Sequence, residues 1–241
     1  MNNLLLFALL LTLSVTAARS TIKFPHDEFQ TSHGPLRIYF VGHGSLILEW
    51  NGKTIYVDPW SRAGDYSGCP PADIVLITHI HQDHFDTAAL RAVLTPDTHV
   101  IANADVCAEL RRGAAMKNGD TLLVGGIRVE AVPAYNTTPG REKFHPKGRD
   151  NGFVLTIGGK RIYIAGDTEN IPEMASLSGI DCAFLPMNQP YTMTPEQVAA
   201  AALAFHPRIL YPYHYGETDC SALQKLLAGA KDIELRIRAM K

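Results

Sequence analysis

Three histidines and one aspartate fall within six consecutive positions of the sequence. They are His79, His81, Asp83 and His84, and they follow the apolar run 74–77. A short apolar run bounded by polar residues predicts a buried strand, so the polar cluster belongs to the loop at its carboxyl end. Imidazole nitrogens and carboxylate oxygens are ligands of Zn²⁺, Mn²⁺ and Fe²⁺. The sequence therefore indicates a binuclear metal site built around this loop.

Two further strand ends deliver residues of the same kind. The strand expected at 161–164 is followed by Gly166 and Asp167, and the strand expected at 208–211 is followed by His214. A carboxylate beside a glycine at a buried strand end suits a bridging metal ligand, although a helix cap is the alternative. The recurrence of a strand followed by a ligand type is the main organising pattern of the chain.

Two other polar residues at strand ends have less definite roles. Asp58 follows the strand expected at 54–57, where it could either accept a hydrogen bond from a metal-bound histidine or begin a turn before Pro59. His43 lies between two glycines, and we expect it at most to support a ligand. Both residues stay outside the predicted ligand set.

The intervening segments alternate between the apolar spacing typical of helices and that typical of strands, which predicts an α/β fold. Helices are expected at 87–93, 104–112, 195–205 and 221–227, and further strands at 98–102, 121–124, 127–132, 153–157, 181–186 and 233–237. The segment before Leu36, which contains Pro25 and Pro35, is expected to be irregular. The stretch 133–151 has no periodicity, and a loop of this length within a domain is often functional.

Composition limits the class of protein. The chain has 241 residues, 46% of them hydrophobic and 19% charged, with a formal net charge of −2. This predicts one globular domain that acts on a small-molecule substrate and binds no nucleic acid. No apolar stretch after the amino terminus is long enough to span a membrane. Assembly into a homo-oligomer stays open.

The amino terminus has the pattern of a secretory signal peptide. An apolar run at 4–11 leads to the small residues Ala17 and Ala18. We therefore expect a signal peptide at 1–18, one globular domain at 19–241, and a secreted or periplasmic location. The four cysteines permit one or two disulfides in an exported protein, or remain buried thiols. They are Cys69, Cys107, Cys182 and Cys220.

The cluster resembles the HxHxDH signature of the metallo-β-lactamase superfamily. The Asp-Pro pair at Asp58, the Gly-Asp-Thr at Asp167 and the late His214 fall in that family's order. The chain looks most like the small stand-alone bacterial branch related to ascorbate-6-phosphate lactonase and N-acyl-phosphatidylethanolamine phospholipase D. The resemblance implies a four-layer αββα sandwich of two mixed sheets, with one or two Zn²⁺ ions, or Mn²⁺ or Fe²⁺, along one edge.

The resemblance also implies a ligand set. His79 and His81 would hold the first metal, and Asp167 would bridge the two metals. The second metal would be held by Asp83, His84 and His214. The family normally supplies a third histidine to the first metal, and here Asn136 stands in that position. Either Asn136 coordinates through its oxygen, or His145 from the same loop replaces it, or the first site is depleted.

The function implied is hydrolysis of an ester, lactone, amide or phosphodiester by a metal-bound hydroxide. Asp83 would orient this nucleophile and accept its proton, and His145 or Tyr215 would stabilise the oxyanion. Lys147 or His145 could also meet a negative charge of the substrate. The alternatives are a non-catalytic metal-binding protein, in which Asn136 has cost activity, and a di-iron redox protein.

Overall fold

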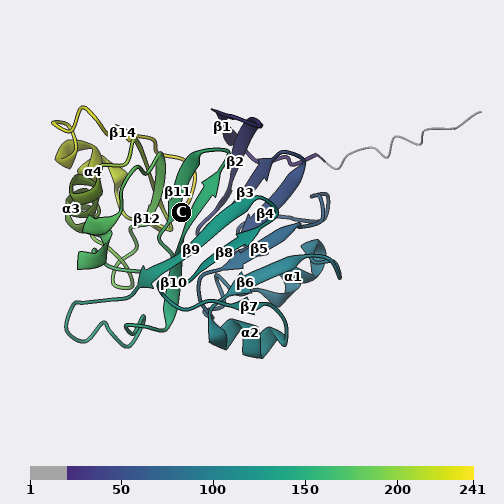
Figure 1. The fold of residues 1–241 in the computed structure, drawn as a ribbon. Coiled ribbons are helices and arrows are strands. Elements are labelled where there is room, and N and C mark those ends of the chain that lie inside the picture. The colour runs from purple at the N-terminus through teal and green to yellow at the C-terminus, as the bar shows by residue number, and fades with distance from the viewer. Residues whose placement is uncertain (1–20) are drawn as a thin grey trace, which may run out of the picture.

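Two seven-stranded β-sheets, packed face to face, form the centre of the molecule (Figure 1). The structure is a computed structural model and describes residues 21–241. The signal peptide expected at 1–18 lies outside the described residues. Among those that are described, no helix is both long and apolar enough to cross a membrane.

The first sheet contains the amino-terminal strands in sequence order. They are β1 (His26–Thr31), β2 (Gly34–Gly42), β3 (Ser45–Trp50), β4 (Lys53–Val57), β5 (Ile74–Ile77), β6 (His99–Ala102) and β7 (Ala114–Ala115). The strands β1 to β4 pair antiparallel, and β4 to β7 pair parallel. Asn51 and Gly52, with φ of 48° and 73°, form the tight turn between β3 and β4.

The second sheet repeats this arrangement. Its strands are β8 (Thr121–Val124), β9 (Ile127–Ala134), β10 (Asp150–Ile157), β11 (Lys160–Ile164), β12 (Cys182–Pro186), β13 (Ile209–Tyr213) and β14 (Glu234–Leu235). The strands β8 to β11 pair antiparallel, and β11 to β14 pair parallel. Parallel pairing places the carboxyl ends of neighbouring strands at the same edge of a sheet, which is where ligands bind in such sheets.

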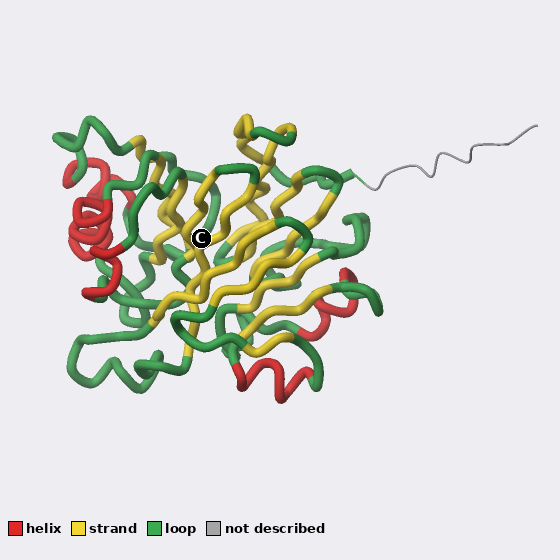
Figure 2. The backbone as a smooth tube through the Cα atoms, in the orientation of Figure 1, coloured by secondary structure: helices red, strands yellow, loops and turns green. Residues whose placement is uncertain are grey.

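Helices lie beside both sheets. Those near the first sheet are α1 (Thr87–Val93) and α2 (Ala104–Leu110), and those near the second are η1 (Pro172–Ser176), α3 (Pro195–Phe205) and α4 (Cys220–Leu226). They occupy two opposite sides of the molecule, and the long loop between β9 and β10 extends from the strands (Figures 1 and 2). A capping box between Thr194 and Gln197 begins α3.

Strand β5 shows how the layers are packed. Ile74 and Leu76 belong to the core between the two sheets, whereas Val75 and Ile77 pack in the second core beneath the outer helices. Because successive side chains point to opposite faces of a strand, a strand covered on both faces is apolar throughout. This burial holds the end of β5, and hence His79, in a fixed position.

Two expectations about the chain need correction or completion. The segment before Leu36 is not irregular, since β1 and β2 form an antiparallel hairpin in which Gln30 is opposite Pro35. Pro35 is tolerated because it lies at the end of the hairpin, where few ladder hydrogen bonds are lost. All four cysteines are free thiols, so the disulfides that the sequence permitted are not formed in the structure.

Candidate metal centre

Histidine and aspartate side chains from five segments meet at one edge of the two sheets. The residues after β5 are His79, His81, Asp83 and His84, those after β11 and β13 are Asp167 and His214, the long loop supplies His145, and the turn between β2 and β3 supplies His43. All six metal ligands predicted from the sequence are therefore brought together. Two histidines outside that set join them.

The first group consists of three histidines. Single ligand atoms of His79, His81 and His145 all lie within 4.8 Å of one another. His79 Nε2 is 3.1 Å from His81 Nδ1, and His145 Nε2 is 3.5 Å from the Asp167 carboxylate. Of the three alternatives that the sequence left open for the first metal, this geometry favours His145 as the third ligand.

Asn136 has a different role. Its side-chain Nδ2 donates to the carbonyl oxygen of Tyr191 at 2.8 Å and to that of Arg141 at 3.3 Å. Its backbone N–H donates to the carbonyl of His145 at 2.9 Å. Asn136 therefore closes the loop that delivers His145, while its Oδ1 is buried without a hydrogen-bond partner among the described residues.

The second group contains Asp83, His84, His214 and, in addition, His43. His214 Nε2 lies 3.4 Å from the Asp83 carboxylate. Asp167 lies between the two groups, because its Oδ1 is 3.3 Å from His84 Nε2 and its Oδ2 is 3.5 Å from both His145 and His214. This is the position that a bridging carboxylate requires.

His43 also reaches the cluster, in the supporting position that the sequence allowed. Its Nε2 lies 2.9 Å from Asp83 Oδ2, and its ring centroid lies 3.6 Å from that of His214. The backbone of His43 has a φ of 54°, and a Cβ on Gly44 would lie only 2.9 Å from His84 Cε1. A histidine flanked by glycines at a strand end was the signal available, because glycine permits such a close approach.

Two buried carboxylates orient the histidine rings. Asp58 Oδ2 is 2.8 Å from His84 Nδ1, and Asp58 also accepts the backbone N–H of Thr78 at 2.8 Å. Asp150 Oδ2 is 3.1 Å from His145 Nδ1. A carboxylate on one ring nitrogen directs the other nitrogen toward a metal. Of the two roles left open for Asp58, the structure shows the hydrogen bond to a histidine.

The electrostatics of the cluster suit cations. Burial lowers the pKa of His79 well below its usual value, which keeps the ring neutral as metal binding requires. Burial also lowers the pKa of His84, but the carboxylates of Asp167 and Asp58 outweigh it and raise that pKa to about 10. The same carboxylates that favour a proton on His84 favour a metal cation in its place.

Unpaired polar atoms point to the same conclusion. Within residues 21–241, His84 Nε2, His214 Nε2 and Asp167 Oδ1 are buried without a hydrogen-bond partner. Buried polar atoms are nearly always paired, so a group of unpaired ones requires an explanation. Imidazole nitrogens and carboxylate oxygens in this number fit two divalent cations as metal ligands.

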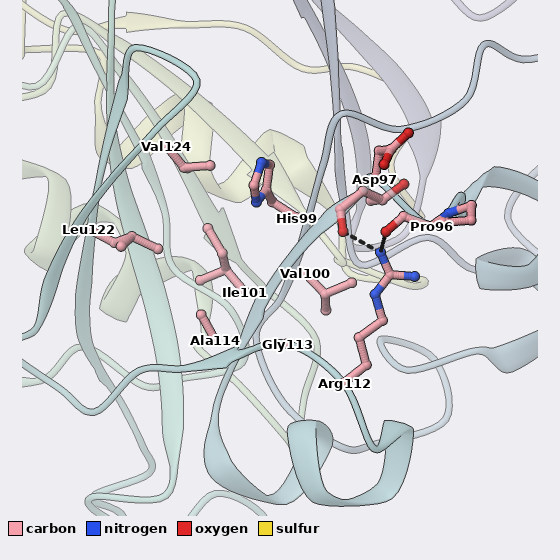
Figure 3. Close-up of a pocket in the computed structure, with 11 residues that line it drawn as sticks. Pro96, Asp97, His99, Val100, Ile101, Arg112, Gly113, Ala114, Leu122 and Val124 are labelled. Atoms are coloured by element: carbon pink, nitrogen blue, oxygen red, sulfur yellow. Dashed lines mark hydrogen bonds between the residues drawn. The ribbon is translucent and has the colours of Figure 1, made fainter.

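The cluster forms the floor of a cavity of about 350 Å³. Its lining residues are His81, Asp83, Phe144, His145, Asp167, Asn188, Tyr191 and His214. A larger cavity of about 710 Å³ lies between β6 and β8 (Figure 3). There the guanidinium of Arg112 is already bonded to the carbonyls of Pro96 and Thr98, and no group of metal-ligand residues is present among the described lining residues.

Two residues considered for substrate contact lie elsewhere. The Tyr215 hydroxyl donates to the carbonyl of Arg238 at 2.8 Å and so anchors the carboxyl-terminal segment. Lys147 Nζ lies 3.0 Å from Glu173 and 3.1 Å from the Tyr135 hydroxyl. Neither side chain lines the cavity. The oxyanion role suggested for Tyr215 and the anion contact suggested for Lys147 therefore lack support in the structure.

The chain is similar to known proteins over most of its length. A family model described as a beta-lactamase superfamily domain matches residues 37–214. A UPF0173 metal-dependent hydrolase from Ligilactobacillus salivarius is 31% identical over 190 residues, which cover 75% of this chain and 85% of the relative. A relative of the same name from Methanosphaera stadtmanae is 32% identical over 197 residues, which cover 75% and 84%.

Solved structures share the fold. A protein from Parabacteroides distasonis assigned as a metal-dependent hydrolase is 53% identical, with a TM-score of 0.88, over 90% of this chain and 100% of that one. The metallo hydrolase Igni18 from Ignicoccus hospitalis has a TM-score of 0.69 at 22% identity, over 84% and 94%. The predicted αββα sandwich is confirmed. The chain belongs to the beta-lactamase superfamily, in the branch of small stand-alone proteins that includes the UPF0173 relatives.

Proposed function

We propose that this protein is a metal-dependent hydrolase that cleaves an ester, lactone, amide or phosphodiester of a small molecule. One observation carries the proposal: two groups of ligand side chains, joined by Asp167, form the floor of an open cavity. Relatives named metal-dependent hydrolases support it. We propose Zn²⁺ as the metal because histidine nitrogen dominates the ligands, and Mn²⁺ or Fe²⁺ would also fit them.

The roles of the residues follow from their positions. Bound there, two divalent cations would supply a Lewis acid and lower the pKa of a water molecule. His79, His81 and His145 would hold one cation, and the group around His214 would hold the other. The buried rings, fixed by Asp58 and Asp150, maintain this arrangement without reorganisation during turnover.

Asp83 is proposed to orient the attacking water. Its side chain is 34% exposed and lines the cavity, whereas Asp167 is buried. Burial raises the pKa of Asp83, but hydrogen bonds with His214 and His43 outweigh this and lower the pKa below its usual range. The carboxylate is therefore ionised and can accept the hydrogen bond that orients an attacking water. Its low pKa makes it a weak base, so it is not proposed to take the proton of that water.

The alternatives are weaker. The non-catalytic alternative depended on a missing ligand at Asn136, and the position of His145 removes that reason. The di-iron redox alternative predicts visible ligand-to-iron absorption and no hydrolysis. An absorption spectrum of the purified protein distinguishes the redox alternative from a zinc hydrolase, because only the redox protein would show these bands.

The test combines metal analysis with a hydrolase panel. Wild-type protein is expected to bind two metal equivalents and to hydrolyse one of the ester, lactone, amide or phosphodiester classes. Asp167→Asn is expected to lose at least one equivalent and most activity. His99→Ala, which removes an exposed histidine on β6, serves as the matched control. Two bound equivalents with no hydrolysis of any class would refute the proposal.

We also propose export, supported by the apolar run at 4–11 and the small residues at 17 and 18. Mass spectrometry of the protein from its natural host is expected to show an amino terminus at residue 18 or 19 in the extracytoplasmic fraction. Full-length protein found only in the cytoplasm would refute it.

A further inference from the structure

Two aromatic side chains line one wall of the cavity above the metal ligands. The rings of Phe144 and Tyr191 are 5.0 Å apart at 74°, an edge-to-face arrangement. Phe144 is half-buried, and Tyr191 is 44% exposed. Phe144 comes from the loop between β9 and β10, and Tyr191 from the segment between β12 and α3. A large exposed aromatic side chain beside a polar site indicates a binding role more strongly than an isolated aromatic side chain elsewhere on the surface.

The two loops are tied together by hydrogen bonds. Asn136 Nδ2 donates to the carbonyl of Tyr191 at 2.8 Å, and Arg141 Nη1 donates to Gln189 Oε1 at 2.6 Å. The turn that carries Tyr191 is closed by its own N–H, which donates to the carbonyl of Asn188 at 3.0 Å. The aromatic pair is therefore held in place before any ligand arrives, which lowers the entropic cost of binding.

The rest of the lining is polar. It consists of the ligand side chains and Asn188, whose side-chain amide has no hydrogen-bond partner among residues 21–241. No Lys or Arg is among the lining residues. A cavity of about 350 Å³ accepts a small molecule, because ligand sites typically measure about 300–1,000 Å³. The cavity thus combines a charged floor with an aromatic wall, and Lys143 Nζ lies 5.2 Å from the centroid of the Phe144 ring.

We propose that Phe144 and Tyr191 form a subsite for a planar apolar group of the substrate, a ring of about phenyl size joined by a short linker to the bond that is cleaved. This rests on the proposed function, which places the scissile bond at the metal ligands. Edge-to-face and offset ring contacts are favourable beyond simple burial. The subsite is expected to increase affinity about tenfold, which corresponds to about 1.4 kcal/mol.

Calorimetry with product-like carboxylates tests the subsite without turnover. Zinc-loaded wild-type protein is titrated with 3-phenylpropanoate and with propanoate, and we expect the phenyl compound to bind about tenfold more tightly. Tyr191→Ala and Phe144→Ala are each expected to reduce this ratio at least threefold. Leu123→Ala, which removes an apolar side chain that is 73% exposed on β8, is the matched control and should keep the ratio.

The outcomes separate the two proposals. Equal binding of the two carboxylates to wild type, or a ratio unchanged in both variants, would overturn the subsite. Phe144→Leu keeps the apolar volume but removes the flat ring, so it replaces Phe144→Ala if thermal melting shows that the alanine variant does not fold. A protein that keeps the binding preference but hydrolyses nothing would refute the proposed function and leave the subsite intact.

Discussion

The ring of His145 is held by Asp150, whose Oδ2 lies 3.1 Å from His145 Nδ1. Both side chains are buried, and Arg149 Nε binds the other carboxylate oxygen at 2.7 Å. The proton on Nδ1 is thereby directed to the carboxylate, and Nε2 is left facing His79 and His81. A histidine far along the chain from the HxHxDH segment thus presents the correct nitrogen to it.

The first prediction concerns metal affinity. His145→Ala is expected to lose one metal equivalent, because it removes a ligand of the first group. Asp150→Asn is expected to weaken binding at this group about 10- to 100-fold, since the ring loses its orienting partner. Chelator competition and elemental analysis measure both effects. Two equivalents held at wild-type affinity by His145→Ala would show that this histidine is no ligand.

The second prediction separates Asn136 from the ligands. Asn136→Ala is expected to retain two metal equivalents, because its Nδ2 donates to loop carbonyls and His145 supplies the third ligand of the first group. Losing these buried hydrogen bonds should destabilise the fold by about 1–3 kcal/mol. Denaturant unfolding measures this change beside metal content. A loss of one equivalent with unchanged stability would instead support coordination by Asn136.

The third prediction concerns the space beside His84. Gly44→Ala would place a Cβ 2.9 Å from His84 Cε1, so the buried ring must shift and metal affinity should fall about tenfold or more. Gly68→Ala is the matched control, because nothing lies within 4 Å of its added Cβ. Metal titration compares the two variants. Equal affinity in both would mean that the ring of His84 moves freely.

The fourth prediction concerns how the stability of the fold depends on pH through Asp27, a partly buried carboxylate on β1 away from the metal ligands. Asp27 on β1 contacts Arg236 at 3.0 Å and Arg238 at 2.8 Å, and it accepts a hydrogen bond from Tyr211. Burial raises the pKa of Asp27, but these hydrogen bonds outweigh it and lower the pKa below 3.8. A lowered folded-state pKa contributes stability above the unfolded pKa, and this stability is lost as the pH falls through the folded value.

Asp27→Asn is therefore expected to cost about 1–3 kcal/mol at pH 7 and progressively less as the pH falls below the usual pKa of an aspartate. Urea unfolding at several pH values measures the difference from wild type. Asp97→Asn, which changes an exposed carboxylate, is the control and should match wild type throughout. A destabilisation by Asp27→Asn that does not change with pH would show that the charge is not its source.

Much of the architecture could be predicted because its signals are local. Helix α1 was expected at 87–93 and is observed there, with Asp86 as its cap. The strand β1 was missed, since His26–Thr31 is stabilised by pairing with β2 and by the contacts of Asp27 with the far end of the chain. Contacts between residues distant in sequence leave no periodicity to detect.

The sequence by itself determined the family, through the HxHxDH segment, and with it the two-sheet fold. It also placed candidate ligands at strand ends, because an apolar strand fixes where the following residues lie. Only the tertiary structure decided that His145 approaches His79 and His81, that Asn136 closes the loop behind it, and that His43 reaches Asp83. These three relationships depend on how a long loop and a glycine-flanked turn pack against other segments. Such packing follows from long-range contacts and buried hydrogen bonds, which no local pattern of residues encodes.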